Sequence, residues 1–174
     1  MRRVLVTCLA VLSAPLAAQA ATTAGRVVLP TNVQPTHYDL AIVPDADHMT
    51  FTGAVKIALD VKSATKTIQL NSADLTFDKV SLDGKATPKV SFDTTEETAT
   101  LTFPAAVKPG KHLLSIDYTG KINPHPSGLF ALDYTDKTGA KKRALFTQFE
   151  NSDARRFVPS WDEPNRKAVF DVTA

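Results

Sequence analysis

Apolar and polar residues alternate with a period of two along most of this chain, and helical spacing is hard to find. The clearest example is the segment 51–61, in which Thr52, Lys56 and Asp60 point away from a row of apolar side chains. A period of two is typical of a strand with one buried face. We therefore expect a strand here, with its buried face formed by Phe51, Val55, Ile57, Leu59 and Val61.

Further segments have the same strand-like pattern, and turn-forming residues such as Asp83-Gly84, 108–110 and Thr138-Gly139 separate several of them. Short turns favour antiparallel neighbours. The predicted fold class is therefore all-β, built from twisted antiparallel sheets. The further expected strands are 37–43, 67–71, 75–82, 89–92, 99–103, 112–118, 129–134 and 143–150.

The last residues, 167–174, begin another alternating segment, and the sequence stops within it. A strand with no following turn or cap is unusual, so we expect the protein to continue past Ala174. Apolar residues make up 43% of the 174 residues, which suffices for one core. We expect one domain over 28–174, incomplete at its C-terminal end, with an open sheet edge and exposed apolar surface there.

The start of the chain has the features of a secretory signal peptide over residues 1–20. A basic pair at 2–3 precedes an apolar run over 4–16, and small residues lie at 18 and 20. The alternative is a membrane anchor, but this run is shorter than the ~20 residues that span a bilayer. We predict cleavage after Ala20, a linker over 21–27, a secreted or periplasmic protein, and no membrane contact beyond the signal peptide.

Cysteine content and charge restrict the partners of the mature chain. The single cysteine, Cys8, lies within the predicted signal peptide, so disulfides and thiolate metal sites are not expected afterwards. Removing residues 1–20 also leaves equal numbers of basic and acidic residues, without a block of one sign. We therefore expect no nucleic-acid partner and no anionic-membrane partner.

No catalytic motif is found along the chain. A hydrolytic zinc site on a helix would read His-Glu-x-x-His, which does not occur, and the four histidines stand apart in sequence. A Gly-x-Ser-x-Gly elbow and Gly-x-Gly phosphate loops are also absent. From its residues alone, the chain is expected to be non-catalytic.

The densest chemistry lies at residues 147–164, TQFENSDARRFVPSWDEP. If the expected strand over 143–150 includes the first four residues of this segment, Gln148 and Glu150 share one face, with side chains about 7 Å apart. An amide beside a carboxylate can grip an ammonium group, because the carboxylate supplies charge and the amide supplies direction. The alternative is that both side chains simply face solvent, as most Gln and Glu on strands do.

Two further interpretations of this segment stay open. Its other charged residues form either a buried ion network or ordinary surface pairs, which contribute well under about 1 kcal/mol each. Trp161 is either a core anchor, which we favour, or a platform for a ligand. The other charged residues concerned are Arg155, Arg156, Asp162 and Glu163.

The same segment resembles the M1 metallopeptidase family of aminopeptidase N-like enzymes. TQFE at 147–150, DARRFVPSWDEP at 153–164 and KAVF at 167–170 are similar to the family pattern Thr-Gln-Phe-Glu, Asp-Ala-Arg, Phe-Pro-Cys-Trp-Asp-Glu-Pro and Lys-Ala-x-Phe. Ser160 replaces the usual cysteine, a small-for-small change. The resemblance covers about 28–174, since family-like segments also occur in order at 29–30, 35–40, 51–53, 68–71 and 128–130.

This resemblance implies a saddle-like N-terminal domain of a zinc aminopeptidase that removes single residues from peptides with a free amino end. It implies that Glu150 pairs with the substrate ammonium and that Gln148 lines the pocket for the first side chain. The zinc and its ligands would belong to the missing catalytic domain, the expected partner, with the Gly-Ala-Met-Glu-Asn and His-Glu-x-x-His segments beyond Ala174. No catalytic or metal-binding residue is expected in this chain, which would be inactive alone.

Two other functions are compatible with the sequence. The first is a stand-alone, non-catalytic β domain that binds peptides or acts as a scaffold. The second is a carbohydrate-binding β-sandwich, which would usually show several exposed aromatic residues. Trp161 is the only tryptophan and lies inside the charged segment, so this second alternative is the weaker one.

Overall fold

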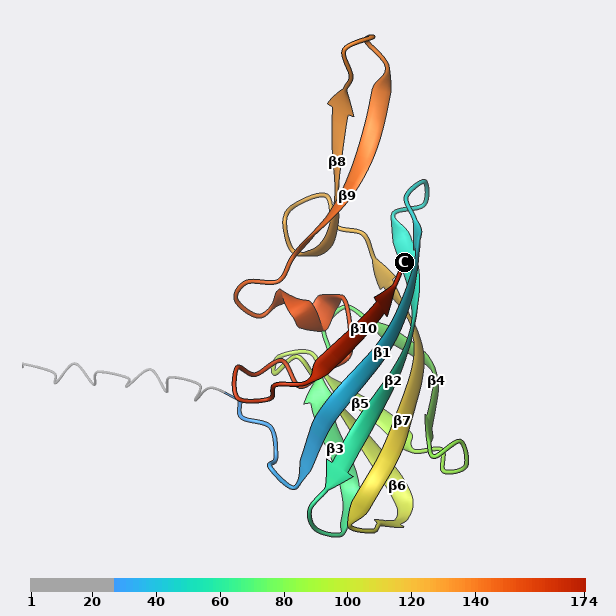
Figure 1. Cartoon of the computed structure of the whole chain (residues 1–174), viewed down its shortest axis with the longest axis vertical. Helices are drawn as coiled ribbons and strands as arrows, with labels where there is room; N and C mark the ends of the chain where they lie inside the picture. Colours follow the sequence, from blue (N-terminus) through green and yellow to red (C-terminus); the bar gives the residue numbers. More distant parts are fainter. Residues whose placement is uncertain (1–26) are drawn as a thin grey trace, which may run out of the picture.

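The computed structural model describes residues 27–174, which form ten strands and one short 3-10 helix (Figure 1). The predicted signal peptide, and all of the predicted linker except Val27, lie outside these residues. Within the described part no helix is long and apolar enough to cross a membrane. The elements are β1 (Val33–Asp45), β2 (Thr50–Val61), β3 (Thr65–Asn71), β4 (Thr76–Leu82), β5 (Lys89–Asp93), β6 (Thr98–Val107), β7 (Gly110–Lys121), β8 (Gly128–Thr135), β9 (Lys141–Gln148), η1 (Asp153–Arg156) and β10 (Val169–Thr173).

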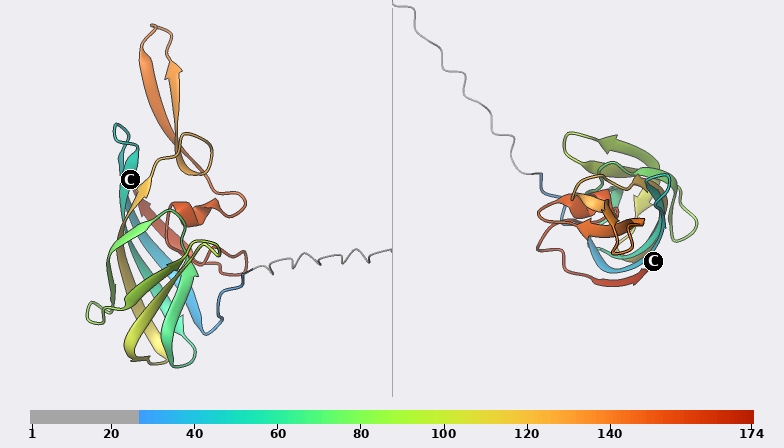
Figure 2. Two further views of the ribbon diagram at one scale, coloured as in Figure 1. Left: turned by 180° about the vertical axis from the view of Figure 1, so that it is seen from behind. Right: turned by 90° about the horizontal axis from the view of Figure 1, so that it is seen from above.

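Two sheets form the body of the molecule, and a third projects from it. The five-stranded sheet has the order β10-β1-β2-β7-β4, and the three-stranded sheet has the order β3-β6-β5. The two sheets are twisted and lie against each other, whereas the β8–β9 hairpin extends beyond one end of the body (Figures 1 and 2). Ile57 and Ile116 of the larger sheet and Ile68 and Leu101 of the smaller one have 0% exposure, so both sheets supply the core.

The predicted strands are confirmed, with shifts of a few residues at their ends. Burial alternates along β2 as the hydrophobic pattern predicted, with Val55, Ile57 and Leu59 buried and Lys56 exposed. Gly53 continues this buried face because the ring of Tyr118 on β7 occupies the space that a side chain at Gly53 would need. The all-β fold class is therefore correct.

One strand pair departs from the antiparallel expectation. β10 pairs with β1 in parallel, with His37 opposite Val169 and Ala41 opposite Thr173. A parallel pair needs a long connection rather than a tight turn, and the rest of the chain provides it. β10 lies at the edge of its sheet, where Phe170 stacks on the ring of Tyr38 with centroids 4.3 Å apart. An open edge at this end was predicted from the sequence.

Candidate functional site

Gln148 is the last residue of the projecting hairpin, where β9 returns to the body (Figure 1). It pairs across the hairpin with Gly128, which has a φ of +63°. A Cβ atom at Gly128 would lie 3.0 Å from the Cβ of Arg156 in η1. Glycine therefore lets η1 pass directly against the base of the hairpin, and this contact positions Gln148.

Glu150 does not lie on β9, and the sequence prediction of a strand through 150 was wrong. β9 ends at Gln148 because Phe149 packs on Phe157, with ring centroids 5.3 Å apart, and its carbonyl accepts a hydrogen bond from the Asp153 N–H at 3.0 Å. These contacts turn the chain toward η1. Gln148 and Glu150 are both exposed to solvent, on either side of a half-buried Phe149.

The turn brings Gln148 and Glu150 together in a way that strand alternation did not anticipate. The Oε1 atom of Gln148 accepts a hydrogen bond from the backbone N–H of Glu150 at 3.2 Å. The amide side chain is thus attached to the residue that carries the carboxylate. An ammonium group next to Glu150 would meet a negative charge and a neighbouring polar amide.

The chain beyond η1 is fastened to both sheets. Trp161 is 4% exposed, so the preferred interpretation of this residue as a core anchor is confirmed. Its backbone N–H donates to the hydroxyl of Tyr38 at 3.1 Å. Burial raises the pKa of Tyr38, so that hydroxyl stays protonated. Ser160 pairs with Asn71 at the end of β3, through backbone hydrogen bonds of 2.8 and 3.1 Å.

The two adjacent arginines form a partly buried ion network, which resolves the alternatives that the sequence left open. Arg155 contacts Asp162 at 3.0 Å and Glu97 at 3.3 Å. Arg156 contacts Asp153 at 2.9 Å and also pairs with Glu97 and Asp74. The Arg155 and Asp162 side chains are 14% and 17% exposed, so these pairs are screened by solvent less than surface pairs are.

A second buried pair fastens the start of the domain to the same loop. The side chains of Glu163 and Arg166 are each 5% exposed, with the nearest nitrogen and oxygen 3.6 Å apart. Glu163 also accepts a hydrogen bond from the backbone N–H of Leu29 at 3.0 Å, and Arg166 donates to the carbonyls of Leu29 and Pro30. This loop therefore has many internal contacts that hold its shape.

Glu150 differs from the other acidic residues of the segment 147–164. Asp153, Asp162 and Glu163 each pair with an arginine. Within residues 27–174, the Glu150 carboxylate has no cationic partner among the ion pairs. Its negative charge is therefore available to a positively charged ligand.

An apolar groove of about 540 Å³ runs beside this loop, between it and the strands β1 and β10. Phe149 and Phe157 line it from the loop, and Leu40 and Phe170 line it from the strands. Asn151, next to Glu150, is also part of its wall. The two residues on either side of Glu150 in the sequence thus line the groove.

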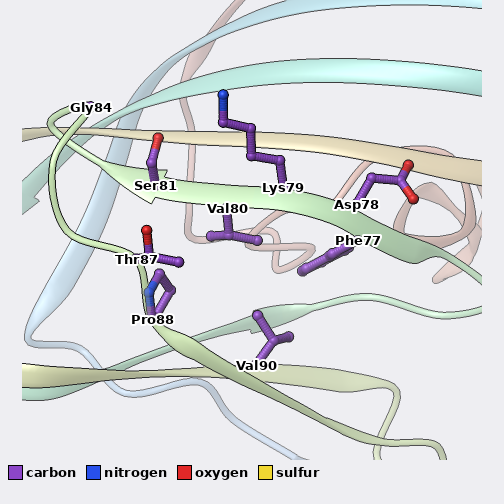
Figure 3. A pocket seen from close by; sticks show the side chains of 9 residues that line it. All are labelled: Phe77, Asp78, Lys79, Val80, Ser81, Gly84, Thr87, Pro88 and Val90. Atoms are coloured by element: carbon purple, nitrogen blue, oxygen red, sulfur yellow. The ribbon is translucent and has the colours of Figure 1, made fainter.

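A second hollow lies between the edges of β4 and β5 and has a different character (Figure 3). Phe77 and Val80 point toward Val90 across it, whereas Lys79 lies on the other side of β4 (Figure 3). Phe77 and Val80 share a face because the pairing with β7 is irregular between Phe77 and Lys79. Polar and charged side chains, those of Asp78, Lys79, Ser81 and Thr87, also line this hollow, and we assign it no chemistry.

The described residues do not fit a zinc ion. Between residues 27 and 174 there is no group of three or more His, Cys, Asp or Glu side chains that could hold a metal. Three histidines instead pair singly with an aspartate: His37 with Asp171, His48 with Asp45, and His112 with Asp83. Any metal of a complete enzyme would need ligands from elsewhere.

Sequence reasoning missed two features close to Gln148. One is the packing of Phe149 on Phe157, which turns the chain before Glu150. The other is the exposed apolar face of the hairpin, where Leu132, Tyr134 and Phe146 are 47%, 51% and 48% exposed. The signal for this face was present, since the pattern at 129–134 lacks a fully polar face.

Comparison with known proteins gives one family. The model of the peptidase M1 N-terminal domain matches residues 34–174. The chain is 41% identical over 163 residues to aminopeptidase N of Acetobacter pasteurianus. The aligned region covers 92% of this chain and 46% of that protein.

Two further relatives are aminopeptidases as well. The chain is 38% identical over 149 residues to aminopeptidase 2 of Candida albicans, covering 85% of this chain and 16% of that protein. It is 37% identical over 153 residues to the alanine/arginine aminopeptidase of Saccharomyces cerevisiae, covering 85% and 18% respectively. The chain thus spans less than half of the length of each of these relatives.

Proposed function

Because the chain belongs to the M1 peptidase family, whose N-terminal domain it contains, we propose that it recognises the free amino end of peptides for an exported aminopeptidase. Glu150 pairs with the substrate α-ammonium group, and Gln148 faces the first side chain. The hydrolytic centre lies outside residues 27–174, which carry no metal site. The relatives named above are aminopeptidases, and this supports a peptide with a free amino end as the substrate.

One observation carries the proposal: Glu150 is exposed and has no cationic partner within residues 27–174, whereas its acidic neighbours are paired with arginines. An exposed carboxylate beside a polar amide suits a substrate ammonium. In a covered site of lower dielectric constant, this pair would discriminate strongly against peptides with a blocked amino end. Fixing the amino end also limits cleavage to the first residue.

The first test is to read the coding sequence past the codon for Ala174. The proposal predicts an open frame that encodes Gly-Ala-Met-Glu-Asn and then His-Glu-x-x-His. An immediate stop codon would contradict it and would favour a stand-alone, non-catalytic peptide-binding or scaffolding domain.

Export is a separate part of the proposal, and the sequence pattern of residues 1–20 supports it. We expect the mature protein to begin at Ala21 and to be found in the periplasm or the medium. Mass spectrometry of the N-terminal peptide of the native protein tests this point. A native N-terminus at Met1 in a cytoplasmic fraction would contradict it.

A further inference from the structure

The face of hairpin β8–β9 that carries Gln148 is apolar, and its outer part is exposed. Direct cross-strand partners share a face, as do residues two apart on one strand. The register pairs Phe130 with Phe146 and Gly128 with Gln148, so these residues lie on one side of the hairpin. We call this side the hairpin face. It consists of the half-exposed Leu132, Tyr134 and Phe146, with Gln148 and the buried Phe130 at its foot.

The opposite side of the hairpin is fixed to the body. Leu129 and Ala131 belong to the core, and Leu145 packs against it. Arg143 pairs with Asp133 at 2.7 Å and donates a hydrogen bond to the carbonyl of Ala46, beyond the end of β1, at 2.6 Å. The hairpin therefore projects from the body in a set direction (Figures 1 and 2). By strand alternation, the hairpin face lies on the side opposite to these contacts.

The form of the hairpin face suits a protein partner better than a small ligand. Sites for small molecules are concave, whereas these side chains stand on a projecting two-stranded ribbon (Figure 2). Contiguous exposed apolar side chains on soluble proteins mark interaction surfaces. A two-stranded hairpin is also marginally stable in water unless it packs against another element.

The position of Gln148 indicates which protein partner binds the hairpin face. If Gln148 and Glu150 hold the amino end of the substrate, the bond to be cut is one residue away, so the catalytic machinery has to approach this side of the hairpin. We propose that the hairpin face is the docking surface for the catalytic part of the aminopeptidase, an inference that rests on the function proposed above. The matched relatives contain ample further polypeptide, since the chain spans 46%, 16% and 18% of them.

The chemistry of the hairpin face defines the complementary surface. Its centre is aromatic and aliphatic, and Lys142 stands opposite Tyr134 at its outer end. The matching surface is an apolar groove with a carboxylate at the end that receives Lys142. Docking there covers the foot of the hairpin, which removes water from around Glu150 and strengthens its attraction for an ammonium group.

Hydrogen exchange measured by mass spectrometry tests the docking without any mutation. The full-length enzyme is compared with the 174-residue chain, and peptides from 128–148 are followed. We expect exchange in these peptides to be about tenfold or more slower in the full-length enzyme. Peptides from β4 and β5 (76–93), which lie away from the hairpin, serve as the internal control. Equal exchange of 128–148 in the two proteins would overturn the inference.

A matched pair of substitutions tests the same surface by activity. Leu132→Arg places a charge on the hairpin face, and Leu113→Arg places the same charge on β7, where the leucine is similarly exposed (47% and 43%). In the full-length enzyme, we expect Leu132→Arg to lower kcat/KM about tenfold or more, as loss of an interface hot spot does. Leu113→Arg should have little effect. Circular dichroism of both variants in the 174-residue chain checks that each still folds.

The outcomes separate this inference from the proposed function. Unchanged activity of Leu132→Arg, together with a strong loss on Glu150→Gln, rejects the docking surface and keeps amino-end recognition. Slow exchange at 128–148, together with unchanged activity of Glu150→Gln, keeps the docking surface and rejects amino-end recognition.

Discussion

The side-chain oxygen of Gln148 lies 3.2 Å from the backbone nitrogen of Glu150 and accepts its hydrogen bond. This bond crosses the turn that ends β9, with the half-buried Phe149 between the two residues. It links the exposed amide of Gln148 to the backbone of Glu150, whose carboxylate is also exposed. The two residues therefore act as one unit, and substitutions at each have distinct expected effects.

Removing the charge of Glu150 while keeping its shape tests ammonium recognition. In the full-length enzyme, we expect Glu150→Gln to lower kcat/KM for free-amino substrates by a factor of about 30 to 4,000, since losing one member of a desolvated charge pair costs about 2 to 5 kcal/mol. Steady-state kinetics with an aminoacyl chromogenic substrate measures this decrease in kcat/KM. Glu96→Gln, at another exposed glutamate, is the matched control. Identical kinetics for both variants would rule out the role of Glu150.

Replacing Gln148 tests the bond to the Glu150 backbone. Gln148→Met keeps the length of the side chain but removes the acceptor, and the expected loss in kcat/KM is about 2- to 13-fold, the equivalent of one hydrogen bond of 0.5 to 1.5 kcal/mol. Gln148→Glu still has an oxygen that can accept this bond. If the bond matters, the Glu variant should retain more activity than the Met variant. The reverse order would show that Gln148 acts in another way.

Substitutions at two glycines with positive φ distinguish the stability cost of overpacking at the hairpin base from the cost of backbone strain. Gly128 and Gly139 have φ of +63° and +85°, but only at Gly128 would a Cβ meet neighbouring atoms, those of Arg156 and Asp153. We expect Gly139→Ala to lower the free energy of unfolding by about 1 kcal/mol through strain alone. Gly128→Ala should cost about 1 to 3 kcal/mol more because of overpacking. Urea unfolding of the 174-residue variants measures both, and equal losses would refute the packing role of Gly128.

The arginine network is expected to stabilise the loop that carries Glu150. Arg155→Met leaves Asp162 and Glu97, whose side chains are 17% and 27% exposed, without this partner. The expected loss of unfolding free energy is about 1 to 3 kcal/mol, between the values for exposed and fully buried pairs. Lys111→Met, which removes an exposed partner of Asp60, should cost under about 1 kcal/mol. Thermal unfolding of the two variants decides whether the network contributes this much.

The pair of His112 and Asp83 predicts a pH dependence of stability. The hydrogen bond that His112 donates to Asp83, at 2.7 Å, raises the pKa of His112, and the bond to the Lys108 carbonyl adds to this effect. Burial alone would raise the pKa of Asp83, but hydrogen bonds from Leu113 and His112, together with the nearby Lys85, lower it overall.

The sign of the effect follows from these directions. A raised pKa means that protonated His112 stabilises the fold fully below its unfolded pKa of about 6.5, and that this contribution disappears as the pH rises through the higher folded pKa. The lowered pKa of Asp83 stabilises the fold above about pH 3.9, and this part is lost on acidification. His112→Gln should therefore destabilise the chain more at pH 6 than at pH 9 in urea unfolding. A pH-independent difference would contradict the charged pair.

The sequence by itself determined the strands and the family. Alternation of side chains along one strand is a local property, so residues 51–61 could be assigned to a strand with the correct buried face. The segment 147–164 likewise carried its family resemblance in its order of residues, and the M1 N-terminal domain match confirms it.

Only the tertiary structure decided which charges of that segment are engaged and where its strand ends. Arg155 meets Glu97 across 58 positions of the chain, and Leu29 meets Glu163 across 134. Contacts over such separations depend on how the two sheets and the loop pack together, which no local pattern records. The same packing places Phe149 against Phe157 and so turns Glu150 out of the strand. Local periodicity therefore encodes the elements, whereas the availability of the Glu150 charge depends on distant residues meeting in the folded chain.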